Sequence, residues 1–333
     1  MAKKIIGITV GDPAGIGPEI VLKALLQHPE IYEICTPVVF APPIVLKEYL
    51  KLLALPGSLI TITDLEKVPQ RLFEGDIVVF NTPLVEPLPA PGEISAAGGE
   101  MSFKAITAAI GQALEKKISA IATAPINKQS LKATQVPFLD HTAIFANFTD
   151  SQNTMTLFVT GNLRIFFYSR HIPFKQIVRA LDQDKLFTTI QTCHHYLKQM
   201  GFTHPHLAVA ALNPHAGEDG LFGTEEMDII TPAIERARAH NLRVTGPIPA
   251  DSVFHLAHRG RYDAVLSLYH DQGHIAAKTL DFFRTISLTL GLPFLRTSVD
   301  HGTAFEIAGK GVASETSMVE AIKAAARYCW SHS

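Results

Sequence analysis

Cysteine is scarce in this chain, and the three that occur, Cys35, Cys193 and Cys329, are odd in number and far apart. Disulfide-dependent secreted domains use many closely spaced cysteines, so this pattern excludes a disulfide framework and indicates reduced thiols. Long hydrophobic runs are missing too. The apolar run behind Lys3 and Lys4 is shorter than the core of a secretion signal, and no run approaches the roughly 20 residues of a membrane span. We therefore expect a cytoplasmic protein without a membrane partner.

An excess of charge of either sign is also absent. The chain carries 29 Lys and Arg against 31 Asp and Glu, a net charge of −2. Binding to nucleic acid requires a basic face, so we expect no nucleic-acid partner. Hydrophobic residues make up 47% of the 333 positions, and this length exceeds the roughly 250–300 residues at which one core usually stops growing. Two domains are therefore expected.

Strand-like apolar runs alternate with helix-like stretches along the chain, which predicts an α/β fold with a largely parallel sheet. The first run, residues 5–10, enters a turn with glycines at 11, 15 and 17 before a helix near Glu19. This spacing matches neither the dinucleotide fingerprint nor a P-loop, so it favours an ordinary strand-to-helix turn. A long helix is expected at residues 99–115. Residues 246–254 contain two prolines and are expected to form a loop that carries Asp251.

Three histidines, His171, His215 and His270, each follow an apolar run by a few residues. In an open α/β sheet, ligands bind outside the carboxyl ends of the strands. Three imidazoles at that edge could converge on one divalent metal ion and leave a fourth position open for catalysis. The chain has fifteen histidines, so a few are expected after strands by chance. The hypothesis of a metal site therefore rests on the placement that these three share. Asp251 and Asp271 are candidate ligands or acceptors for the second ring nitrogens.

Two cations stand in surroundings that favour an anionic ligand. Arg296 lies in an otherwise apolar run, and Lys278 comes eight residues after His270. A charge among apolar neighbours needs a partner, whereas Arg284 is expected on the surface. Residues 297–311 combine a histidine with several small residues and glycines, which permits close backbone approach to a flat ligand. From these residues alone we predict a metal-dependent enzyme that acts on a small phosphorylated or carboxylated compound.

Five longer motifs carry a resemblance to a known family. They are residues 9–19 (Thr-Val-Gly-Asp-Pro-Ala-Gly-Ile-Gly-Pro-Glu), 123–128 (Thr-Ala-Pro-Ile-Asn-Lys), 212–218 (Leu-Asn-Pro-His-Ala-Gly-Glu), 269–273 (Tyr-His-Asp-Gln-Gly) and 290–304 (Leu-Gly-Leu-Pro-Phe-Leu-Arg-Thr-Ser-Val-Asp-His-Gly-Thr-Ala). Together they resemble the 4-hydroxythreonine-4-phosphate dehydrogenase family of pyridoxal phosphate (vitamin B6) biosynthesis. The last motif is also similar to the cofactor loop of isocitrate and isopropylmalate dehydrogenases.

The resemblance implies a fold of two α/β/α domains with a cleft between them, like isocitrate and isopropylmalate dehydrogenases and unlike a Rossmann fold. Residues 1–130 with 298–333 would form a discontinuous first domain. Residues 131–297 would form the second, with the dimer interface and most metal ligands. The family's active site is shared between the two chains of a homodimer.

The resemblance also implies roles for individual residues. One divalent ion per site (Zn2+, Mg2+, Co2+ or Mn2+) and NAD or NADP are expected as cofactors. The metal ligands would be His171, His215 and His270, one of them presented across the dimer interface. The substrate would contact His141, Thr142, Lys278, Ser287 and Arg296. The cofactor would contact Asp300, His301, Gly302 and Thr303. Lys278 and Asp251 are candidate catalytic bases, with a metal-bound water as the third possibility.

The implied reaction is oxidation of the C3 hydroxyl of 4-phosphohydroxy-L-threonine, assisted by a metal acting as a Lewis acid. Its product, 2-amino-3-oxo-4-(phosphonooxy)butanoate, would lose CO2 to form 3-amino-2-oxopropyl phosphate. Two departures from the family pattern bear on the substrate. Ala143 stands where the family usually has Glu, and Ser287 stands where it usually has Asn. The alternatives are therefore a related dehydrogenase of 4-phosphorylated threonate, or a non-catalytic relative that binds metal and ligand.

Overall fold

The structure, a computed structural model, describes residues 3–330 and divides the chain into two compact units. Unit 1 is the chain up to Thr154 together with the chain from Ile286 onward, and unit 2 is Met155–Thr285. The sequence had suggested boundaries near residues 130 and 298. They lie elsewhere because helix α6 (His141–Phe148) packs on α4 (Ala96–Leu114), and strand β11 (Ile286–Leu290) pairs with β12 (Leu295–Val299). All four elements belong to unit 1.

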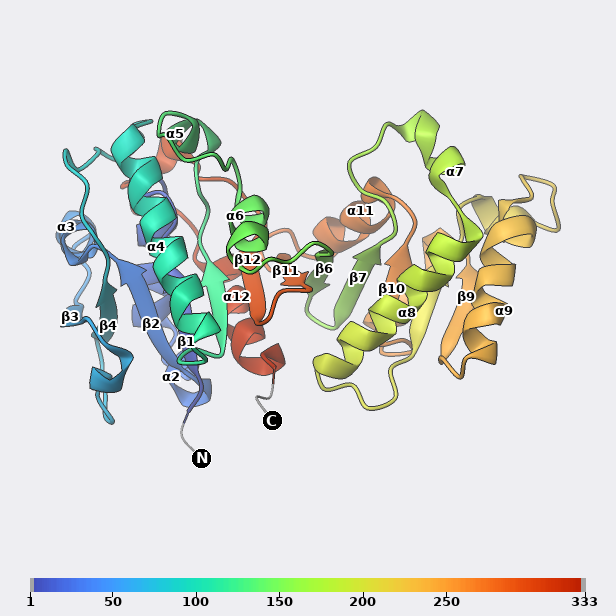
Figure 1. Cartoon of the computed structure of the whole chain (residues 1–333), viewed down its shortest axis with the longest axis horizontal. Helices are drawn as coiled ribbons and strands as arrows, with labels where there is room; N and C mark the ends of the chain where they lie inside the picture. Colours follow the sequence, from blue (N-terminus) through green and yellow to red (C-terminus); the bar gives the residue numbers. More distant parts are fainter. Residues whose placement is uncertain (1–2, 331–333) are drawn as a thin grey trace. The chain divides into compact units, whose positions relative to one another are not determined.

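Unit 1 contains a seven-stranded run in the order β3-β4-β2-β1-β5-β12-β11 (Figure 1). Every neighbouring pair is parallel except β11 and β12, which are antiparallel. The remaining strands are β1 (Ile5–Thr9), β2 (Thr36–Ala41), β3 (Ser58–Ile62), β4 (Asp76–Asn81) and β5 (Ala120–Thr123). Strands β1, β2 and β5 are buried almost throughout. Strands covered on both faces are expected to read as continuous apolar runs, which is how they appear in the sequence.

Helices cover both faces of the unit 1 sheet (Figure 1). Besides α4 and α6 they are α1 (Gly17–Gln27), α2 (Glu30–Ile34), α3 (Pro43–Leu52), α5 (Lys128–Lys132) and α12 (Thr316–Tyr328), with short 3-10 turns at Leu65–Lys67 and Phe305–Ile307. Side chains cap several helix starts. Ser95 accepts a hydrogen bond from the N–H of Gly98 at the start of α4, and Asn127 accepts two at the start of α5. Such caps satisfy backbone donors that have no partner within the helix.

Unit 2 has five strands in the order β6-β7-β10-β8-β9. They are β6 (Met155–Thr160), β7 (Leu163–Phe167), β8 (Leu207–Ala210), β9 (Val244–Ile248) and β10 (Ala264–Ser267). Only β6 runs antiparallel to its neighbour. Strands β7, β10, β8 and β9 are parallel. The carboxyl ends of these four strands therefore meet at one edge of the sheet.

The helices of unit 2 are α7 (Ile177–Ala180), α8 (Gln183–Gln199), α9 (Thr231–Ala239), α10 (Ala250–His258) and α11 (His270–Leu280), with turns at Phe174–Gln176 and Pro214–Gly217 and a π-helix at Glu226–Ile230. The prediction of a loop at residues 246–254 is wrong. Strand β9 continues to Ile248, and Asp251 lies in the first turn of α10. Proline is tolerated in β9 because this is an edge strand, and Pro249 sits at the N-cap of α10, where its missing N–H costs nothing.

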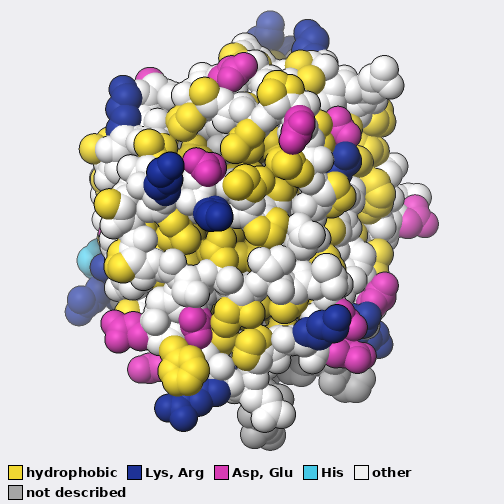
Figure 2. Space-filling view, turned by 90° about the vertical axis from the view of Figure 1, so that its left-hand side faces the viewer, with side chains coloured by type: hydrophobic (Ala, Val, Ile, Leu, Met, Phe, Trp, Pro, Cys, Tyr) yellow, Lys and Arg dark blue, Asp and Glu magenta, His cyan; other side chains and the backbone are white. Residues whose placement is uncertain are grey.

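No helix within residues 3–330 is long and apolar enough to cross a membrane. The three cysteines are free and buried, as their number and spacing suggested. Figure 2 shows one face of unit 1, on which lysine and arginine side chains are interspersed with acidic ones. Neither sign of charge gathers on that face.

Candidate functional site

The three histidines singled out from the sequence follow three neighbouring parallel strands of unit 2. Strand β10 lies between β7 and β8. His171 follows β7, His215 follows β8, and His270 follows β10. Since neighbouring strands lie ~4.8 Å apart, the ends of all three fall within about 10 Å of one another. The three strands that precede these histidines are therefore neighbours, as the prediction requires.

Within one chain, two of these imidazoles come close and the third does not complete a metal site. The ring centroids of His171 and His270 are 5.9 Å apart. The side chain of His215 is 67% exposed. Across residues 3–330, no group of three or more His, Cys, Asp and Glu side chains is placed to hold a metal ion. Within these residues, the three histidines therefore do not gather at one point.

The ring nitrogens of two histidines nevertheless show the pairing typical of metal ligands. Nδ1 of His270 lies 2.6 Å from a carboxylate oxygen of Asp271, and Nδ1 of His215 lies 3.4 Å from one of Glu218. A carboxylate on Nδ1 leaves Nε2 as the nitrogen for a metal and orients the ring. The chemistry of this donor set, imidazoles backed by carboxylates, fits a divalent transition metal.

The residues that follow His270 explain the local motif. The Oε1 of Gln272 accepts hydrogen bonds from the N–H of Leu268 and the hydroxyl of Ser267, while its Nε2 donates to the carbonyl of Ala211 at 2.7 Å. This buried amide ties the end of β10 to the end of β8. A Cβ on Gly273 would lie only 2.6 Å from the ring of Phe167 in β7. The motif thus joins α11 to all three strands.

His270, His274 and Lys278 recur every four residues and so share one face of α11. The rings of His270 and His274 stack with centroids 3.7 Å apart and an interplanar angle of 14°. The rings of Phe158 and Phe167 also contact His274. Burial, together with the neighbouring His270, Lys278 and Arg170, lowers the pKa of His274 to about 4. The sequence reasoning missed His274, although its spacing from His270 was a usable signal.

In unit 1, Arg296 is a buried cation without an acidic partner. The side chain on β12 is 5% exposed, and burial lowers its pKa to about 10 despite the opposing effect of Asp140. Its guanidinium donates to the hydroxyls of Thr123 and Thr289 and lies 5.3 Å above the ring of Phe145. Within the described chain, no carboxylate lies within 4 Å of it. A desolvated guanidinium held only by neutral groups is suited to an anionic ligand.

His141 begins α6, and its imidazole is buried close to Arg296. Burial and then the charge of Arg296 hold the pKa of His141 well below its usual range. Its Nε2 is buried without a hydrogen-bond partner. Asp140 caps the helix by accepting a hydrogen bond from the N–H of Ala143. Thr142, which follows His141, is exposed. A neutral imidazole, a hydroxyl and the Arg296 guanidinium thus belong to one unit.

The predicted cofactor residues lie in the loop after β12. The carbonyl of Thr303 accepts a hydrogen bond from the N–H of Ile16 at 3.0 Å, which joins this loop to the turn before α1. Nε2 of His301 lies 2.8 Å from the hydroxyl of Ser317 in α12. Gly302 is exposed and has no atom near the place of a Cβ. The loop is therefore fixed at Thr303 and His301 and open at Gly302.

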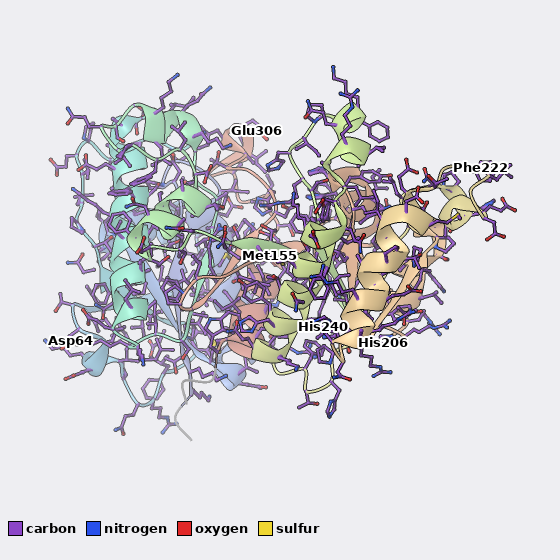
Figure 3. The ribbon with its side chains drawn as sticks, turned by 45° about the vertical axis from the view of Figure 1, so that its right-hand side comes forward. Asp64, Met155, His206, Phe222, His240 and Glu306 are labelled. Atoms are coloured by element: carbon purple, nitrogen blue, oxygen red, sulfur yellow. The ribbon has the colours of Figure 1, made fainter. Side chains whose placement is uncertain are left out.

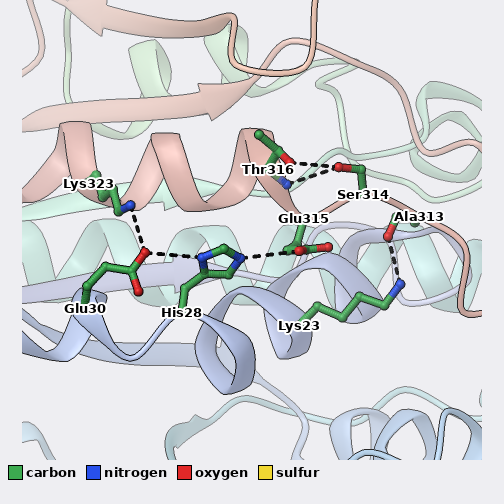
Figure 4. A network of polar contacts seen from close by, with 8 residues as sticks. All are labelled: Lys23, His28, Glu30, Ala313, Ser314, Glu315, Thr316 and Lys323. Carbon is green, nitrogen blue, oxygen red and sulfur yellow. Dashed lines mark hydrogen bonds and ion pairs between the residues drawn. The ribbon is translucent and has the colours of Figure 1, made fainter. Parts of the chain in front are cut away.

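A buried ion pair from α1 holds the segment that continues this loop. Lys23 lies 2.8 Å from the carboxylate of Glu19 and donates to the carbonyls of Gly311 and Ala313. Glu19 in turn accepts from the N–H groups of the same two residues. Figure 4 shows the hydrogen bond from Lys23 to the carbonyl of Ala313 and, beside it, the ring of His28 between the carboxylates of Glu30 and Glu315. Glu19, which ends the first motif, thus has a definite structural role.

The remaining site residues lie as follows. Ser287 is half-buried on β11, opposite Ser298 of β12. The Nζ of Lys278 lies 5.2 Å from the ring centre of Phe282. Asp251 is exposed, and so is Arg284, which lies 3.8 Å from Asp281. The surface position expected for Arg284 is confirmed.

Comparison with known proteins gives consistent matches over nearly the whole chain. A sequence model of the family described as "Pyridoxal phosphate biosynthetic protein PdxA" matches residues 33–325. Proteins from Halalkalibacterium halodurans and Symbiobacterium thermophilum are 48% and 46% identical over 328 and 327 residues. Each match covers 98% of this chain and 97% of the relative. Both relatives carry the name "Putative D-threonate 4-phosphate dehydrogenase".

Among solved structures, that of a 4-hydroxythreonine-4-phosphate dehydrogenase from Klebsiella pneumoniae resembles this chain with a TM-score of 0.88. The two sequences are 39% identical, and the match covers 97% of this chain and 98% of the other. The likeness extends to both units. The expected α/β fold is therefore confirmed over the part of the chain that this match covers.

Proposed function

The chain belongs to the family of the pyridoxal phosphate biosynthetic protein PdxA, and from this premise we propose a dehydrogenase that acts on a phosphorylated hydroxy acid. It oxidises the C3 hydroxyl of a four-carbon acid phosphorylated at C4, with NAD or NADP as the hydride acceptor. The observation that carries the proposal is the placement of His171, His215 and His270 after three neighbouring parallel strands. The three free thiols fit a reaction in the cytoplasm.

These three histidines would hold one divalent ion, for which Zn2+, Mg2+, Co2+ and Mn2+ are candidates. When bound, the ion supplies Lewis acidity at the C3 hydroxyl. Asp271 and Glu218 orient the rings of His270 and His215 through Nδ1. That support is one reason to assign the metal to these residues.

A homodimer would complete the site. Since no three ligands gather within the described part of one chain, a second copy is needed to supply the third. Large apolar side chains near the ligands are exposed, as expected of a surface that a partner covers. Phe174, three residues from His171, is 78% exposed. Leu221 and Phe222 protrude from the segment after His215, where Phe222 is labelled in Figure 3.

Arg296 and Lys278 are the proposed binding groups for the phosphate, Arg296 because it is buried without an acid. His141, as a neutral imidazole with a free Nε2, can donate or accept a hydrogen bond to the substrate. Thr142 and Ser287 add hydroxyls. Lys278 shares a helix face with His270. As a neutral amine it is, with Asp251, a candidate base for the C3 proton, and in that role it leaves the phosphate to Arg296.

Oxidation leaves a ketone at C3, β to the carboxylate, so the product readily loses CO2. From 4-phosphohydroxy-L-threonine this yields 3-amino-2-oxopropyl phosphate. From D-threonate 4-phosphate, which carries a hydroxyl at C2, it yields 3-hydroxy-2-oxopropyl phosphate. In both routes the oxidation transfers one hydride to the nicotinamide and releases one proton, and the loss of CO2 then takes up one proton at C2.

The second substrate is favoured by a specific observation. Two relatives that are 46–48% identical are named for D-threonate 4-phosphate, whereas the solved structure named for 4-hydroxythreonine-4-phosphate is 39% identical. Ser287 and Ala143 also replace longer polar side chains usual for the first substrate. We therefore expect D-threonate 4-phosphate to be the better substrate.

The deciding experiment combines metal analysis of the purified protein with a kinetic assay of both substrates, each with NAD and with NADP. The proposal predicts that the purified protein contains bound metal and produces reduced cofactor from at least one substrate. The His215→Ala variant should lose both the metal and the turnover but remain a folded dimer. If neither substrate gives reduced cofactor with Zn2+, Mg2+ or Mn2+ added, the proposed dehydrogenase activity is rejected. Full activity of His215→Ala would remove the metal site.

A further inference from the structure

The backbone that carries His215 is strained. Four residues other than glycine, His215, Ala216, Glu218 and Asp219, have φ values between +43° and +59°. The left-handed conformation is unfavourable for an L-residue because its Cβ approaches the following carbonyl oxygen. Such strain persists only where the surrounding structure holds the backbone in place. The segment 215–219 therefore needs an anchor.

Glu226 provides that anchor. Its side chain is 2% exposed and belongs to the π-helix Glu226–Ile230. Oε1 accepts hydrogen bonds from the N–H groups of Leu212 at 2.8 Å and Asn213 at 2.7 Å. Oε2 accepts from the side-chain amide of Asn213 at 2.8 Å. The carboxylate thus fixes the two residues that lead into the left-handed segment.

The same carboxylate also touches the middle of the strained segment. A Cβ on Gly217 would lie 2.9 Å from Oε2 of Glu226, and the φ of Gly217 is +81°. Only glycine allows this approach and this conformation together. Glu225 adds one more hydrogen bond to the amide of Asn213.

Glu226 has an unusual environment for a structural carboxylate. Buried acids are normally paired with a cation, yet no Lys, Arg or His of the described chain lies within 4 Å of it. Three N–H groups from the segment before His215 satisfy it instead. The turn that carries it is π-helical, a geometry that occurs frequently at functional sites.

We infer that Glu226 is a positioning residue for His215. Its carboxylate holds Leu212 and Asn213, so the left-handed segment begins at a fixed point and the imidazole leaves the sheet edge in a fixed direction. Without this anchor the strained residues can relax to right-handed φ values, which moves His215 away from the other ligands. The inference rests on the proposed role of His215 as a metal ligand.

The test is Glu226→Gln, studied as the metal-free dimer to which Zn2+ or Mn2+ is added in a calorimeter. Glutamine keeps one oxygen but turns an NH2 group toward N–H donors, so the anchor is lost while the volume is kept. We expect metal affinity to fall about 10–100-fold, the usual effect of removing a partner that orients a ligand. Amide exchange in residues 215–220 should rise. Asp228→Asn, an exposed change of equal charge in the same π-helix, should leave the affinity unchanged.

Asn213→Ala covers the case in which Glu226→Gln does not fold. It removes the side-chain bonds to Glu226 and Glu225 but keeps both backbone bonds to Glu226, so it should weaken metal binding less. If His215→Ala loses the metal while Glu226→Gln and Asn213→Ala, as folded dimers, bind it like the unchanged protein, the inference alone is overturned. If His215→Ala itself binds the metal normally, the proposed metal site fails and the inference fails with it. A purely structural Glu226 would lower the melting temperature without changing the affinity of the folded dimer.

Discussion

Arg296 donates two hydrogen bonds to one oxygen, the Oγ1 of Thr123, from Nε at 3.2 Å and from Nη2 at 3.0 Å. The same hydroxyl donates to the carbonyl of Thr297 at 3.1 Å, so its direction is fixed. Neutral hydroxyls therefore hold a buried positive charge without neutralising it. The fold keeps a costly charge at this position, which is expected where an anionic ligand supplies the missing partner.

Replacing Arg296 by Met should separate stability from binding. Removing an unneutralised buried charge and filling its volume is often neutral or stabilising by about 1–4 kcal/mol. Loss of a charged hydrogen bond of about 1.5–3 kcal/mol should raise the KM for the phosphorylated substrate at least tenfold. Urea unfolding and steady-state kinetics measure the two effects. A large loss of stability with an unchanged KM would make Arg296 purely structural.

The placement of the three histidines after neighbouring strands could be predicted because parallel strands place their carboxyl ends at one edge. The apolar runs before His171, His215 and His270 were visible in the sequence, and only their adjacency had to be assumed. The order β7-β10-β8 supplies that adjacency. Local pattern and a general rule of sheets were sufficient here.

Two other features could not be predicted, because they depend on tertiary contacts. Glu226 stands beside Glu225 in a stretch that reads as an exposed helix, and its burial follows from the bonds to Leu212 and Asn213. The prolines around Asp251 suggested a loop, but an edge strand and a helix start accept them. The residue types in these stretches do not reveal that β9 is an edge strand or that residues 215–219 have a left-handed backbone.

The pKa of His141 predicts how stability depends on pH. Its folded pKa lies well below the unfolded value because of burial and Arg296. Above about pH 6.5 both states are neutral, so stability does not change. As the pH falls below that value only the unfolded state binds the proton, and stability is lost at up to about 1.4 kcal/mol per pH unit. Urea unfolding from pH 7 to 5 should show a smaller loss in His141→Gln, and equal losses would contradict the shift.

Glu19→Gln should loosen the attachment to α1 of the segment that continues the proposed cofactor loop. Glu19 is fully buried, and with Lys23 it binds four backbone groups of Gly311 and Ala313. Breaking a buried ion pair leaves the other charge uncompensated and costs about 3–5 kcal/mol. The KM for NAD or NADP should rise while kcat at saturating cofactor changes little. A constant KM would show that the pair Glu19–Lys23 does not affect binding of the cofactor.

The matched control is Glu100→Gln. Glu100 and Lys104 form the same i, i+4 pair at 2.8 Å, but both side chains are partly exposed. Exposed helix pairs contribute about 0.3–0.5 kcal/mol. The control should therefore leave both thermal stability and cofactor KM nearly unchanged.

Gly273→Ala should disturb α11, which carries His270 and Lys278. Its Cβ would lie 2.6 Å from the ring of Phe167 and 2.8 Å from the Cγ2 of Ile165. Overpacking of this kind costs about 1–3 kcal/mol and should push the helix off the sheet, which lowers metal affinity as well. Gly111→Ala in α4 is the control, because nothing lies within 4 Å of its Cβ position. It should stabilise by about 0.5–1 kcal/mol in thermal unfolding.

Ser287→Asn should change which substrate is preferred. The two candidate substrates differ at C2, where one has an ammonium group and the other a hydroxyl. Serine reaches less far than asparagine, the residue usual at this position in the 4-hydroxythreonine-4-phosphate dehydrogenase pattern. One added hydrogen bond is worth about 1 kcal/mol, so the ratio of kcat/KM values should move at least about fivefold toward 4-phosphohydroxy-L-threonine. Ser58→Asn, an exposed serine on the edge strand β3, should leave the ratio unchanged. An unaltered ratio in Ser287→Asn would place the choice of substrate in other residues.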